Sequence, residues 1–514
     1  MAQEFKLKDV TSLQMKNGEK KEVEVEGVEG GKVLLLKVQD QVHATSSNCT
    51  HYGAPLVKGV LTPEGRLTCP WHGACFKVST GDVEDAPALD PIAKYEVIEK
   101  DGAVYVKTTE EALKNNRKFL NIKCSSVSED KVLVIGGGSG TLGAIEGLRG
   151  GGYNGKITVI SKEGYQPIDR TKLSKALLAD ISKAAWRSKE FYKDASIDII
   201  EDEAKSVDFS SKKVSTKSGK DYEYSKLVLA TGGTPRWLPL DGLKGDLGNV
   251  FLLRTLPDAQ NILKAVGENG KKVVVVGSSF IGMEVGNCLA GMKNDVTIIG
   301  MEEEPMERVM GKKVGAIFRG LLEKNGVKFK MGASVEKATP SKSDSSKVGA
   351  VHLKDGTTLE ADLVIEGVGV APATEYLKDN SSVTLEKDGS LKTNESFEVN
   401  GLKDVYAIGD IATYPYHAKP FIPVFWSALG SQLRYCGNTV NGYDDVVLQG
   451  EPEKPSFVAY YTKGETVVAV ASMMKDPYMT QAAELMRRNK MPGKSELQKG
   501  VDILEVGLPN EIKI

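Results

Sequence analysis

A strand, a glycine-rich turn and a helix follow one another twice in this chain, and this repeat constrains the fold more than any other feature. The first copy starts with KVLVIGGGSG (131–140), continues through a helix-like stretch to Arg149, and ends in the strand KITVIS (156–161). The second copy starts about 140 residues later with KKVVVVGSSFIGMEVGNCLAGM (271–292) and is followed by DVTIIG (295–300). Each copy reads as a βαβ unit, in which the strands pair in parallel and the helix covers the sheet. We therefore expect two α/β domains in the middle of the chain.

The segments on either side of these units have different patterns. Residues 1–108 contain short strands separated by glycine turns, which predicts a small all-β domain. Residues 109–130 are polar and irregular, as a linker is. The pattern EPEKPSFVAYYTKGETVVAVASM (451–473) predicts strands, and we expect a C-terminal α+β domain at 445–514. The fold class is thus multidomain, with the first α/β domain at 131–255 and 396–444 and the second at 256–395.

The composition limits the partners and the compartment. The 67 basic and 69 acidic residues nearly cancel, so we expect no nucleic acid partner. The six cysteines are too few and too scattered for a disulfide scaffold, which favours a reducing compartment. We expect no membrane span, because no apolar run approaches the roughly 18–20 residues that cross a bilayer. The opening residues lack an apolar signal core and an arginine, so we expect a cytoplasmic location, with the mitochondrion as the alternative.

Two Cys–His pairs form the sharpest motif. CTH (49–51) is followed, 17 residues on, by CPWH (69–72). A zinc site could use such a set, but zinc fingers place both cysteines in one arm and both histidines in the other. A Rieske [2Fe–2S] cluster binds one iron through two cysteines and the other through two histidines. We predict that Cys49, His51, Cys69 and His72 bind such a cluster, with structural zinc as the alternative.

The residues around these ligands, CTHYGAP (49–55) and CPWHGACF (69–76), closely resemble the Rieske family motif. High-potential members of that family carry two further cysteines and two hydroxyl side chains beside the cluster. The matching positions here are Ala54 and Trp71 for the cysteines, and Ala74 and Phe76 for the hydroxyls. Fewer hydrogen bonds to sulfur stabilise the reduced cluster less. The resemblance thus implies a ferredoxin-type centre, in the lower half of the roughly −150 to +300 mV range of such clusters.

The first glycine turn has the features of a dinucleotide site. Its small residues let a pyrophosphate approach the backbone, and the N-terminus of the following helix stabilises the negative charge. Thr141 stands where a third glycine is usual, and Glu163 is the nearest acid for an adenosine ribose. The candidate contacts at this turn are Gly136, Gly138, Ser139, Gly140, Thr141 and Glu163.

Three later motifs place this turn in a family context. YQPIDRTKLSKALL (165–178), LVLATGGTPR (227–236) and VYAIGDIA (405–412) occur in this order. Together they resemble the FAD-binding elements of the apoptosis-inducing-factor family and of related ferredoxin reductases in oxygenase systems. Taken singly, each motif is also compatible with an ordinary strand-end turn, and Trp426 with core packing. The resemblance implies further FAD contacts from Arg170, Lys175, Thr231, Gly232, Asp410 (at the ribityl chain) and Trp426 (against the flavin edge).

The second glycine turn is the candidate nicotinamide site. The acids at 302–304 follow its second strand and could bond ribose hydroxyls or repel the 2′-phosphate of NADPH. Gly300 occupies the position where relatives often have the ribose-binding glutamate, and a solvated loop is the alternative interpretation of the acids. We predict NADH as the donor, with NADPH less favoured. The candidate contacts are Gly277, Ser279, Phe280, Ile281, Gly282, Glu284, Glu302 and Gly369.

A pair of charged residues is the candidate catalytic element. In the family that the chain resembles, an acid at the position of Glu284 pairs with the lysine at the position of Lys175, near the flavin. The resemblance implies the same pair here. A fixed positive charge at that place favours the anionic reduced flavin. The alternative is a salt bridge with a structural role only.

The combination of these sites points to electron transfer. Residues 141–175 contain no cysteine and the second α/β unit contains only Cys288, so a dithiol relay is disfavoured. We expect an NAD(P)H-dependent FAD oxidoreductase that passes electrons from NADH through FAD to its own Rieske cluster and on to an unidentified acceptor, as a monomer or homodimer. The arrangement resembles the Rieske-bearing branch of the apoptosis-inducing-factor family. The alternatives are an NADH-sensing regulatory or apoptosis-related protein with slow turnover, and an interaction protein whose cofactors are structural.

Overall fold

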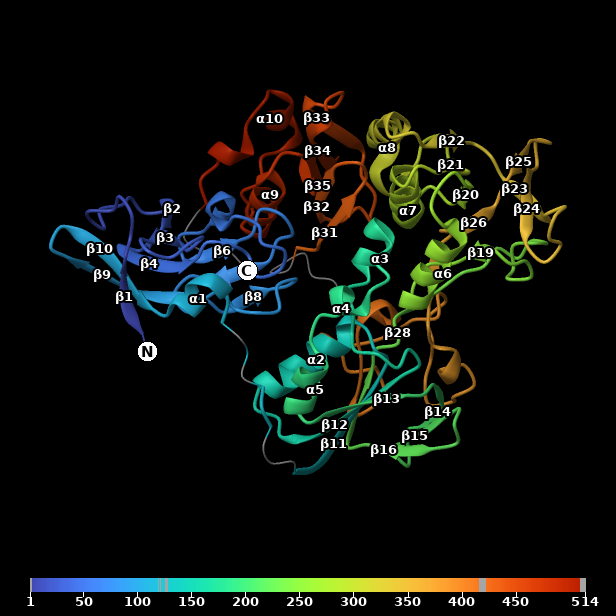
Figure 1. Cartoon of the computed structure of the whole chain (residues 1–514), viewed down its shortest axis with the longest axis horizontal. Coiled ribbons are helices and arrows are strands. Elements are labelled where there is room, and N and C mark those ends of the chain that lie inside the picture. The colour runs from blue at the N-terminus through green and yellow to red at the C-terminus, as the bar shows by residue number, and fades with distance from the viewer. Residues whose placement is uncertain (1, 119, 121, 125–127, 416–421, 509–514) are drawn as a thin grey trace. The chain divides into compact units, whose positions relative to one another are not determined.

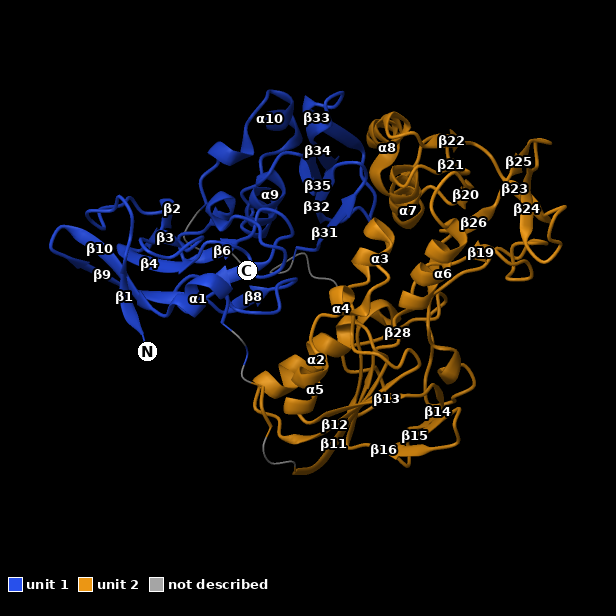
Figure 2. Ribbon diagram, viewed as in Figure 1, with its two compact units in different colours: residues 1–120, 417–514 blue, residues 121–416 orange. Residues whose placement is uncertain are grey.

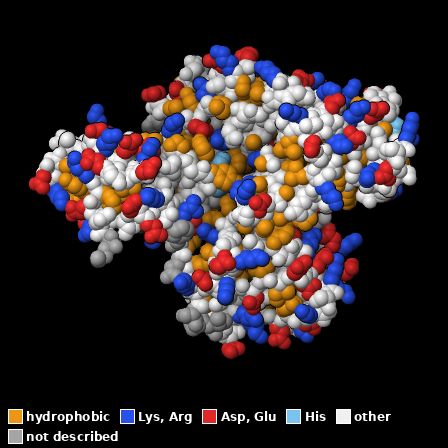
Figure 3. Space-filling model, viewed as in Figure 1, with side chains coloured by type: hydrophobic (Ala, Val, Ile, Leu, Met, Phe, Trp, Pro, Cys, Tyr) orange, Lys and Arg blue, Asp and Glu red, His pale blue; other side chains and the backbone are white. Residues whose placement is uncertain are grey.

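The computed structural model describes residues 2–118, 120, 122–124, 128–415 and 422–508. The chain forms two compact units, one of residues 1–120 and 417–514 and one of residues 121–416 (Figure 2). Acidic and basic side chains are interspersed over the face seen in Figure 3, in keeping with the net charge of −2. None of the described helices is both long and apolar enough to cross a membrane.

The N-terminal part of the first unit is all-β. Its larger sheet has the strand order β1 (Gln3–Lys6), β10 (Ala103–Thr108), β9 (Lys94–Lys100), β4 (Gln41–Ser46), β3 (Lys32–Val38) and β2 (Lys20–Glu24). The smaller sheet contains β5 (Val60–Leu61), β6 (Arg66–Thr68), β7 (Cys75–Lys77) and β8 (Val83–Asp85). Alternate residues of β3 point into two different cores, Val33 and Leu35 into one and Leu34 and Leu36 into the other. Burial on both faces explains the apolar run at the centre of KVLLLKV.

The predicted linker contains a short helix. Residues 110–115 form α1 (Glu110–Asn115), and the Thr109 side chain caps it by accepting a hydrogen bond from the Ala112 amide. Leu113 is its one buried residue and joins the core of the larger sheet. A single buried residue gives no helical period, so the sequence pattern did not predict this helix.

The C-terminal part of the first unit is an antiparallel sheet with two helices. The strand order is β31 (Val424–Ala428), β32 (Gln432–Gly437), β35 (Thr466–Met473), β34 (Ser456–Lys463) and β33 (Asp445–Glu451), with α9 (Tyr478–Arg487) and α10 (Lys494–Gln498) after the strands. The sheet therefore begins at Val424, whereas the sequence pattern placed the start of this domain at 445 and gave residues 422–444 to the first α/β domain. The polar residues Arg434 and Gln432 interrupt the apolar pattern of β32, so the sequence pattern does not mark this segment as a strand of the C-terminal sheet.

The second unit contains both predicted α/β domains. The first has a parallel sheet of β13 (Ile197–Glu201), β12 (Gly155–Ser161), β11 (Ser128–Ile135), β17 (Lys226–Leu229) and β29 (Val405–Ala407). Around it lie α2 (Ser139–Gly150), α3 (Thr171–Ala176), α4 (Ile181–Ala184), α5 (Lys189–Asp194), β14 (Ala204–Asp208), β15 (Lys213–Thr216) and β16 (Asp221–Glu223). The helices α2 and α5 lie beside β12 and β13 (Figure 1).

The second α/β domain repeats this topology. Its parallel sheet has the order β22 (Lys328–Lys330), β21 (Asp295–Ile299), β20 (Lys272–Val276), β26 (Leu363–Glu366) and β19 (Val250–Phe251). The predicted boundaries at 255 and 395 are therefore wrong, because β19 pairs in the second sheet while Leu377 and Leu391 pack in the core of the first domain. The helices are α6 (Leu256–Val266), α7 (Phe280–Gly291) and α8 (Glu307–Lys324), and a small sheet holds β23 (Val335–Pro340), β24 (Val348–Leu353) and β25 (Thr358–Glu360). Short strand pairs β18 (Gly233–Pro235) with β27 (Val370–Pro372), and β28 (Leu391–Lys392) with β30 (Ala412–Thr413), complete the unit. In both domains the strand before the glycine turn is the middle strand of the sheet, so each turn lies at the end of a central strand.

Candidate functional site

A cavity lies at the first glycine turn. It has a volume of about 540 Å³ and is open at the end of β11. The helix α2 begins there without a side-chain cap, because its N-cap is Gly138. A Cβ on Gly138 would meet no atom within 4 Å, so the first turn of α2 presents bare backbone to the cavity. That arrangement suits a pyrophosphate group.

Close packing explains why the turn is glycine-rich. A Cβ on Gly136 would lie 2.1 Å from the carbonyl oxygen of Ala230, which follows β17, and would force the two strand ends apart. Thr141 is fully buried and donates to the Gly136 carbonyl at 2.8 Å, so it stabilises the turn from behind. Thr141 does not line the cavity. The predicted residues that do line it are Gly136, Gly138, Ser139, Gly140, Glu163, Arg170, Thr231, Gly232 and Asp410.

Several charged residues of this cavity form ion pairs with one another. Glu163 forms an ion pair with Arg170 and accepts a hydrogen bond from the hydroxyl of Tyr165. Asp410 forms an ion pair with Arg254, with 2.8 Å between Oδ2 and Nη2. The sequence predicts that Glu163 binds a ribose. The structure adds that Arg170 fixes its carboxylate through the ion pair.

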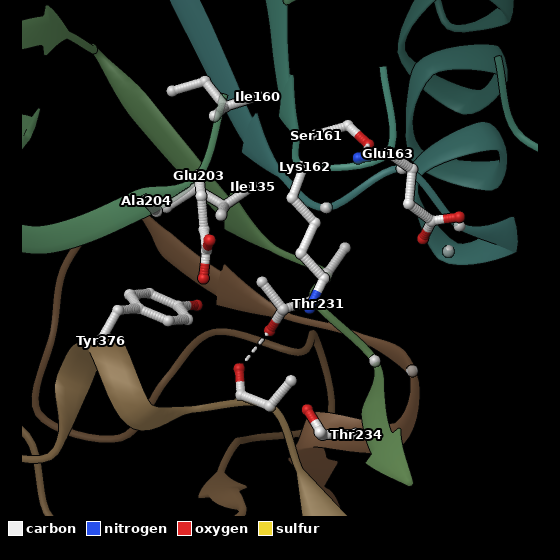
Figure 4. A pocket seen from close by; sticks show the side chains of 18 of the residues that line it. Ile135, Ile160, Ser161, Lys162, Glu163, Glu203, Ala204, Thr231, Thr234 and Tyr376 are labelled. Atoms are coloured by element: carbon white, nitrogen blue, oxygen red, sulfur yellow. Dashed lines mark hydrogen bonds between the residues drawn. The ribbon is translucent and has the colours of Figure 1, made fainter. Parts of the chain in front are cut away.

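Several cavity residues were missed by the sequence analysis. Figure 4 shows Lys162, Glu203 and Tyr376 around the same space as Thr231, whose hydroxyl donates to the Ala373 carbonyl at 2.7 Å. Tyr376 lies outside the sequence motifs described above, and burial raises the pKa of its hydroxyl. These residues come from segments far from the glycine turn, and no local pattern marks them.

The predicted pair Lys175 and Glu284 is present. Lys175 Nζ lies 3.0 Å from Glu284 Oε1, and the carboxylate is buried. Ser174 donates a second hydrogen bond to the other oxygen of Glu284. The lysine comes from α3 and the acid from α7, so the pair joins the two α/β domains within this unit.

The second glycine turn has the same construction as the first. A Cβ on Gly277 would lie 2.4 Å from the Gly367 carbonyl, and one on Gly282 would lie 2.0 Å from the Gly277 carbonyl. The helix α7 starts after Ser279 without a side-chain cap, and Ile281 in its first turn is exposed. Phe280 begins α7, and Gly369 follows β26 beside β27 with open space where a Cβ would stand.

The acids after β21 are in ion pairs. Glu302 lies 2.6 Å from the Arg308 guanidinium, and Glu303 lies 2.6 Å from the Lys312 ammonium. A side chain at Gly300 would meet Ser278 Oγ at 2.4 Å and Met331 at 2.6 Å. The position of the usual ribose-binding acid is therefore closed to a side chain unless these neighbours move, and Glu302 is the nearest acid in sequence.

In the first unit, the four predicted metal ligands form two pairs. His51 Nδ1 and His72 Nδ1 are 3.0 Å apart, and the thiols of Cys49 and Cys69 share a hydrogen bond. That bond raises the pKa of Cys49 and lowers the pKa of Cys69. Among the described residues, no three or more His, Cys, Asp and Glu side chains gather in the way that a single ion requires. A Rieske cluster instead takes two sulfurs and two nitrogens on separate irons, and the two pairs fit that requirement.

The two ligand loops have the same backbone construction. The Cys49 amide donates to Ala54 and the Gly53 amide to Cys49, and the Cys69 amide donates to Ala74 and the Gly73 amide to Cys69. Gly53 and Gly73 both have φ of +76°, a conformation that favours glycine. The positions expected to lack cluster-directed hydroxyls, Ala74 and Phe76, are fully buried in the core.

Two residues beside the ligands complete this description. Cys75 is buried, which raises the pKa of its thiol to about 12 and keeps it protonated. Trp426 lies in the first unit, with its ring centroid 4.3 Å from that of His72 and 5.4 Å from that of His51. The structure thus places Trp426 beside the histidine pair, and its contact with the flavin edge stays a prediction.

Comparisons with known proteins agree with this architecture. Residues 130–423 match the family of pyridine nucleotide-disulphide oxidoreductases, residues 5–96 match the Rieske [2Fe-2S] domain, and residues 424–504 match the reductase C-terminal domain. Human apoptosis-inducing factor 3 is 37% identical over 94% of this chain and 84% of its own length. Rubredoxin-NAD(+) reductase of Pseudomonas putida is 33% identical over 55% of this chain and 71% of its own.

A solved structure supports the same conclusion. The covalent complex of putidaredoxin reductase with putidaredoxin contains a chain that superposes with a TM-score of 0.69 and 26% identity, over 74% of this chain and 98% of that one. The C-terminal match begins at residue 424, where the sheet of the first unit also begins. The chain is therefore an NAD(P)H-dependent oxidoreductase that belongs to the pyridine nucleotide-disulphide oxidoreductases, in the Rieske-bearing branch of the apoptosis-inducing-factor family.

Proposed function

We propose that this chain takes electrons from NADH and passes them through FAD to a Rieske [2Fe–2S] cluster bound by Cys49, Cys69, His51 and His72, and from there to an external acceptor. The observation that carries the proposal is the arrangement of the four ligands as a sulfur pair and a nitrogen pair in a chain that also holds a dinucleotide cavity. When bound, FAD accepts two electrons as a hydride and releases them singly, and the cluster accepts one electron at a time.

The residues of the cavity have separate tasks in this proposal. The bare first turn of α2 holds the pyrophosphate, and the buried Thr141 keeps the turn in shape. Arg254 holds Asp410 at 2.8 Å, which fixes the carboxylate where it can accept hydrogen bonds from the hydroxyls of a ribityl chain. Arg170 and Tyr165 fix Glu163 in the same way for a ribose.

Lys175 supplies a positive charge of fixed position. Its partner Glu284 is buried and is held from the other side by Ser174, so the ammonium cannot turn freely toward solvent. A cation held in this way stabilises negative charge that develops nearby, at no cost of reorganisation during the reaction.

NADH is the donor that the second glycine turn favours. The run of acids at 302–304 opposes a 2′-phosphate, and Glu302 can accept hydrogen bonds from ribose hydroxyls. The proposed preference for NADH over NADPH rests on these acids.

Anaerobic addition of NADH to the purified protein tests the proposal. We expect the flavin absorbance to bleach first and a Rieske-type EPR signal to follow. The variant Cys69→Ala should keep the flavin change and lose the signal, because one cluster ligand is missing. The matched control is Cys75→Ala, which removes a buried thiol six residues away that is not a predicted ligand and should leave the signal intact. Zinc in the site, or a cluster that stays oxidised while the flavin is reduced, would refute the proposal.

A further inference from the structure

The C-terminal sheet presents two side chains toward the ligand loops of the same unit. Trp426 and Arg434 are directly opposite each other on the paired strands β31 and β32, so they share one face of the sheet. The Trp426 ring lies beside the rings of His72 and His51. Val424 on β31 packs on the second loop, where a Cβ at Gly73 would stand 3.3 Å away from it. This face of the sheet therefore covers the cluster site.

Arg434 is a buried charge on this covering face. It is 3% exposed, and a guanidinium stays protonated in proteins. Its Nη1 donates to Gln432 at 3.0 Å, while its Nε has no hydrogen-bond partner among the described residues. A charge buried with so few partners is costly to the fold, and such groups are often kept because they act on a neighbour.

The acid nearest to Arg434 neutralises its positive charge only in part. Asp476 is its counter-ion, with 3.7 Å between Oδ1 and Nε, which is long for an ion pair. Burial raises the pKa of Asp476, although Arg434 and Lys58 both act to lower it. On the side of the ligand loops, Arg434 lies opposite Trp426, whose ring lies beside the rings of both ligand histidines.

We propose that Arg434 raises the reduction potential of the iron–sulfur cluster by holding a positive charge on the sheet face that covers the ligand loops. The inference rests on the proposed function, because it requires a cluster at these ligands. Reduction adds one electron to the cluster and forms or breaks no bond at Arg434, and the electron comes from reduced FAD. The reduced cluster carries one more negative charge, so a buried cation nearby stabilises the reduced form more than the oxidised form.

In this proposal, the charge of Arg434 stabilises the reduced cluster in place of hydroxyl groups that the ligand loops lack. Ala74 and Phe76 offer no hydroxyl to the sulfurs, so the side-chain hydrogen bonds that hydroxyls would supply at these two positions are missing. The reductase C-terminal domain, which carries Arg434, would then set the potential of a cluster that it does not itself bind.

EPR-monitored redox titration of the holoprotein tests the proposal with three variants. Arg434→Met should shift the reduction equilibrium toward the oxidised cluster by roughly tenfold, which is 59 mV for one electron. Asp476→Asn removes the counter-charge and should shift the equilibrium in the opposite direction. Arg434→Lys keeps the charge and should restore most of the wild-type potential. The matched control is Lys463→Met, which removes an exposed cation from β34 of the same sheet and should change the equilibrium less than twofold.

The outcomes separate this inference from the proposed function. A wild-type protein without a Rieske signal overturns both. A wild-type signal together with a potential that is the same in Arg434→Met and in the control overturns the role of Arg434 alone. If Arg434→Met fails to fold or to bind iron, Asp476→Asn and Arg434→Lys decide, and a potential that does not rise in Asp476→Asn overturns the inference.

Discussion

A buried arginine joins the Rieske domain to the reductase C-terminal domain, and its removal should destabilise the first unit strongly. Arg488, directly after α9, is fully buried. Its guanidinium forms ion pairs with Glu64 of the Rieske domain and, at 3.5 Å, with Glu484 of α9. Glu484 is only 2% exposed and also accepts a hydrogen bond from Thr68 at 3.5 Å. We consider the variant Arg488→Met, which keeps most of the volume and removes the charge.

The expected cost comes from Glu484 rather than from the lost contacts of Arg488. Glu64 is partly exposed and can be hydrated, so it loses little. Glu484 stays buried, with the Arg487 guanidinium 3.9 Å away and the charge of Arg66 also acting on it. Removing one partner of a buried ion pair costs about 3–5 kcal/mol. Because Arg487 compensates in part, we expect the lower end, about 3 kcal/mol.

Native-state hydrogen exchange measures this loss locally. Exchange of the amides in α9, β32 and β35 should accelerate by about a hundredfold, since each 1.4 kcal/mol corresponds to a factor of ten. The double variant Arg488→Met with Glu484→Gln leaves no stranded charge and should recover most of the protection. The control Lys8→Met breaks the exposed pair of Lys8 and Glu24 and should leave the stability almost unchanged. A loss below about 1 kcal/mol in Arg488→Met, or costs that simply add in the double variant, would refute the reasoning.

Three further results are expected. Lys175→Ala should slow flavin reduction by NADH in stopped-flow measurements by about 100-fold or more, whereas Lys172→Ala on the same helix should not; equal rates in both variants would remove the role of Lys175. Glu302→Gln frees Arg308 for a 2′-phosphate and should raise the ratio of kcat/KM for NADPH to that for NADH by roughly tenfold, and an unchanged ratio would show that Glu302 does not select the coenzyme. Burial raises the pKa of Glu366 from 4.5 to about 7, so the folded chain holds this proton more tightly than the unfolded chain. The free energy of unfolding should therefore fall as the pH rises from 4.5 to about 7, by up to about 1.4 kcal/mol per pH unit, and Glu366→Gln should remove this slope from denaturant titrations.

The parts of the fold that the sequence predicted are those with a local pattern. The two βαβ units have an apolar strand, a glycine turn and a helix in direct succession, and both form with the same sheet topology. The four metal ligands were recognisable because each cysteine and its histidine lie in one short loop. The pairing of Lys175 with Glu284 was predicted only through the family resemblance, because these residues are 109 positions apart.

The unpredicted parts depend on contacts that no local pattern records. Arg434 interrupts the apolar pattern of β32 because it lies opposite Trp426 at the ligand loops, although it shares a face of β32 with Cys436 of the sheet's own core. Glu484 and Arg488 have the composition of a solvated helix face, yet they are buried against the Rieske domain. The lining residues Glu203 and Tyr376 reach the dinucleotide cavity from separate segments. In each case tertiary contact, and not the neighbouring sequence, determines the environment of the residue.

The twin construction of the ligand loops has a consequence for how iron enters the protein. Each loop is closed by amide-to-carbonyl bonds of its own, from the amides of Cys49, Gly53, Cys69 and Gly73, and none of these bonds uses a ligand side chain. We expect this region to fold before the metal binds, unlike a zinc finger, which has no fold until its ion binds. Protein prepared under iron starvation should therefore show the same β-sheet circular dichroism as the iron-loaded protein. Cluster insertion should be a late step, after the ligand loops have folded.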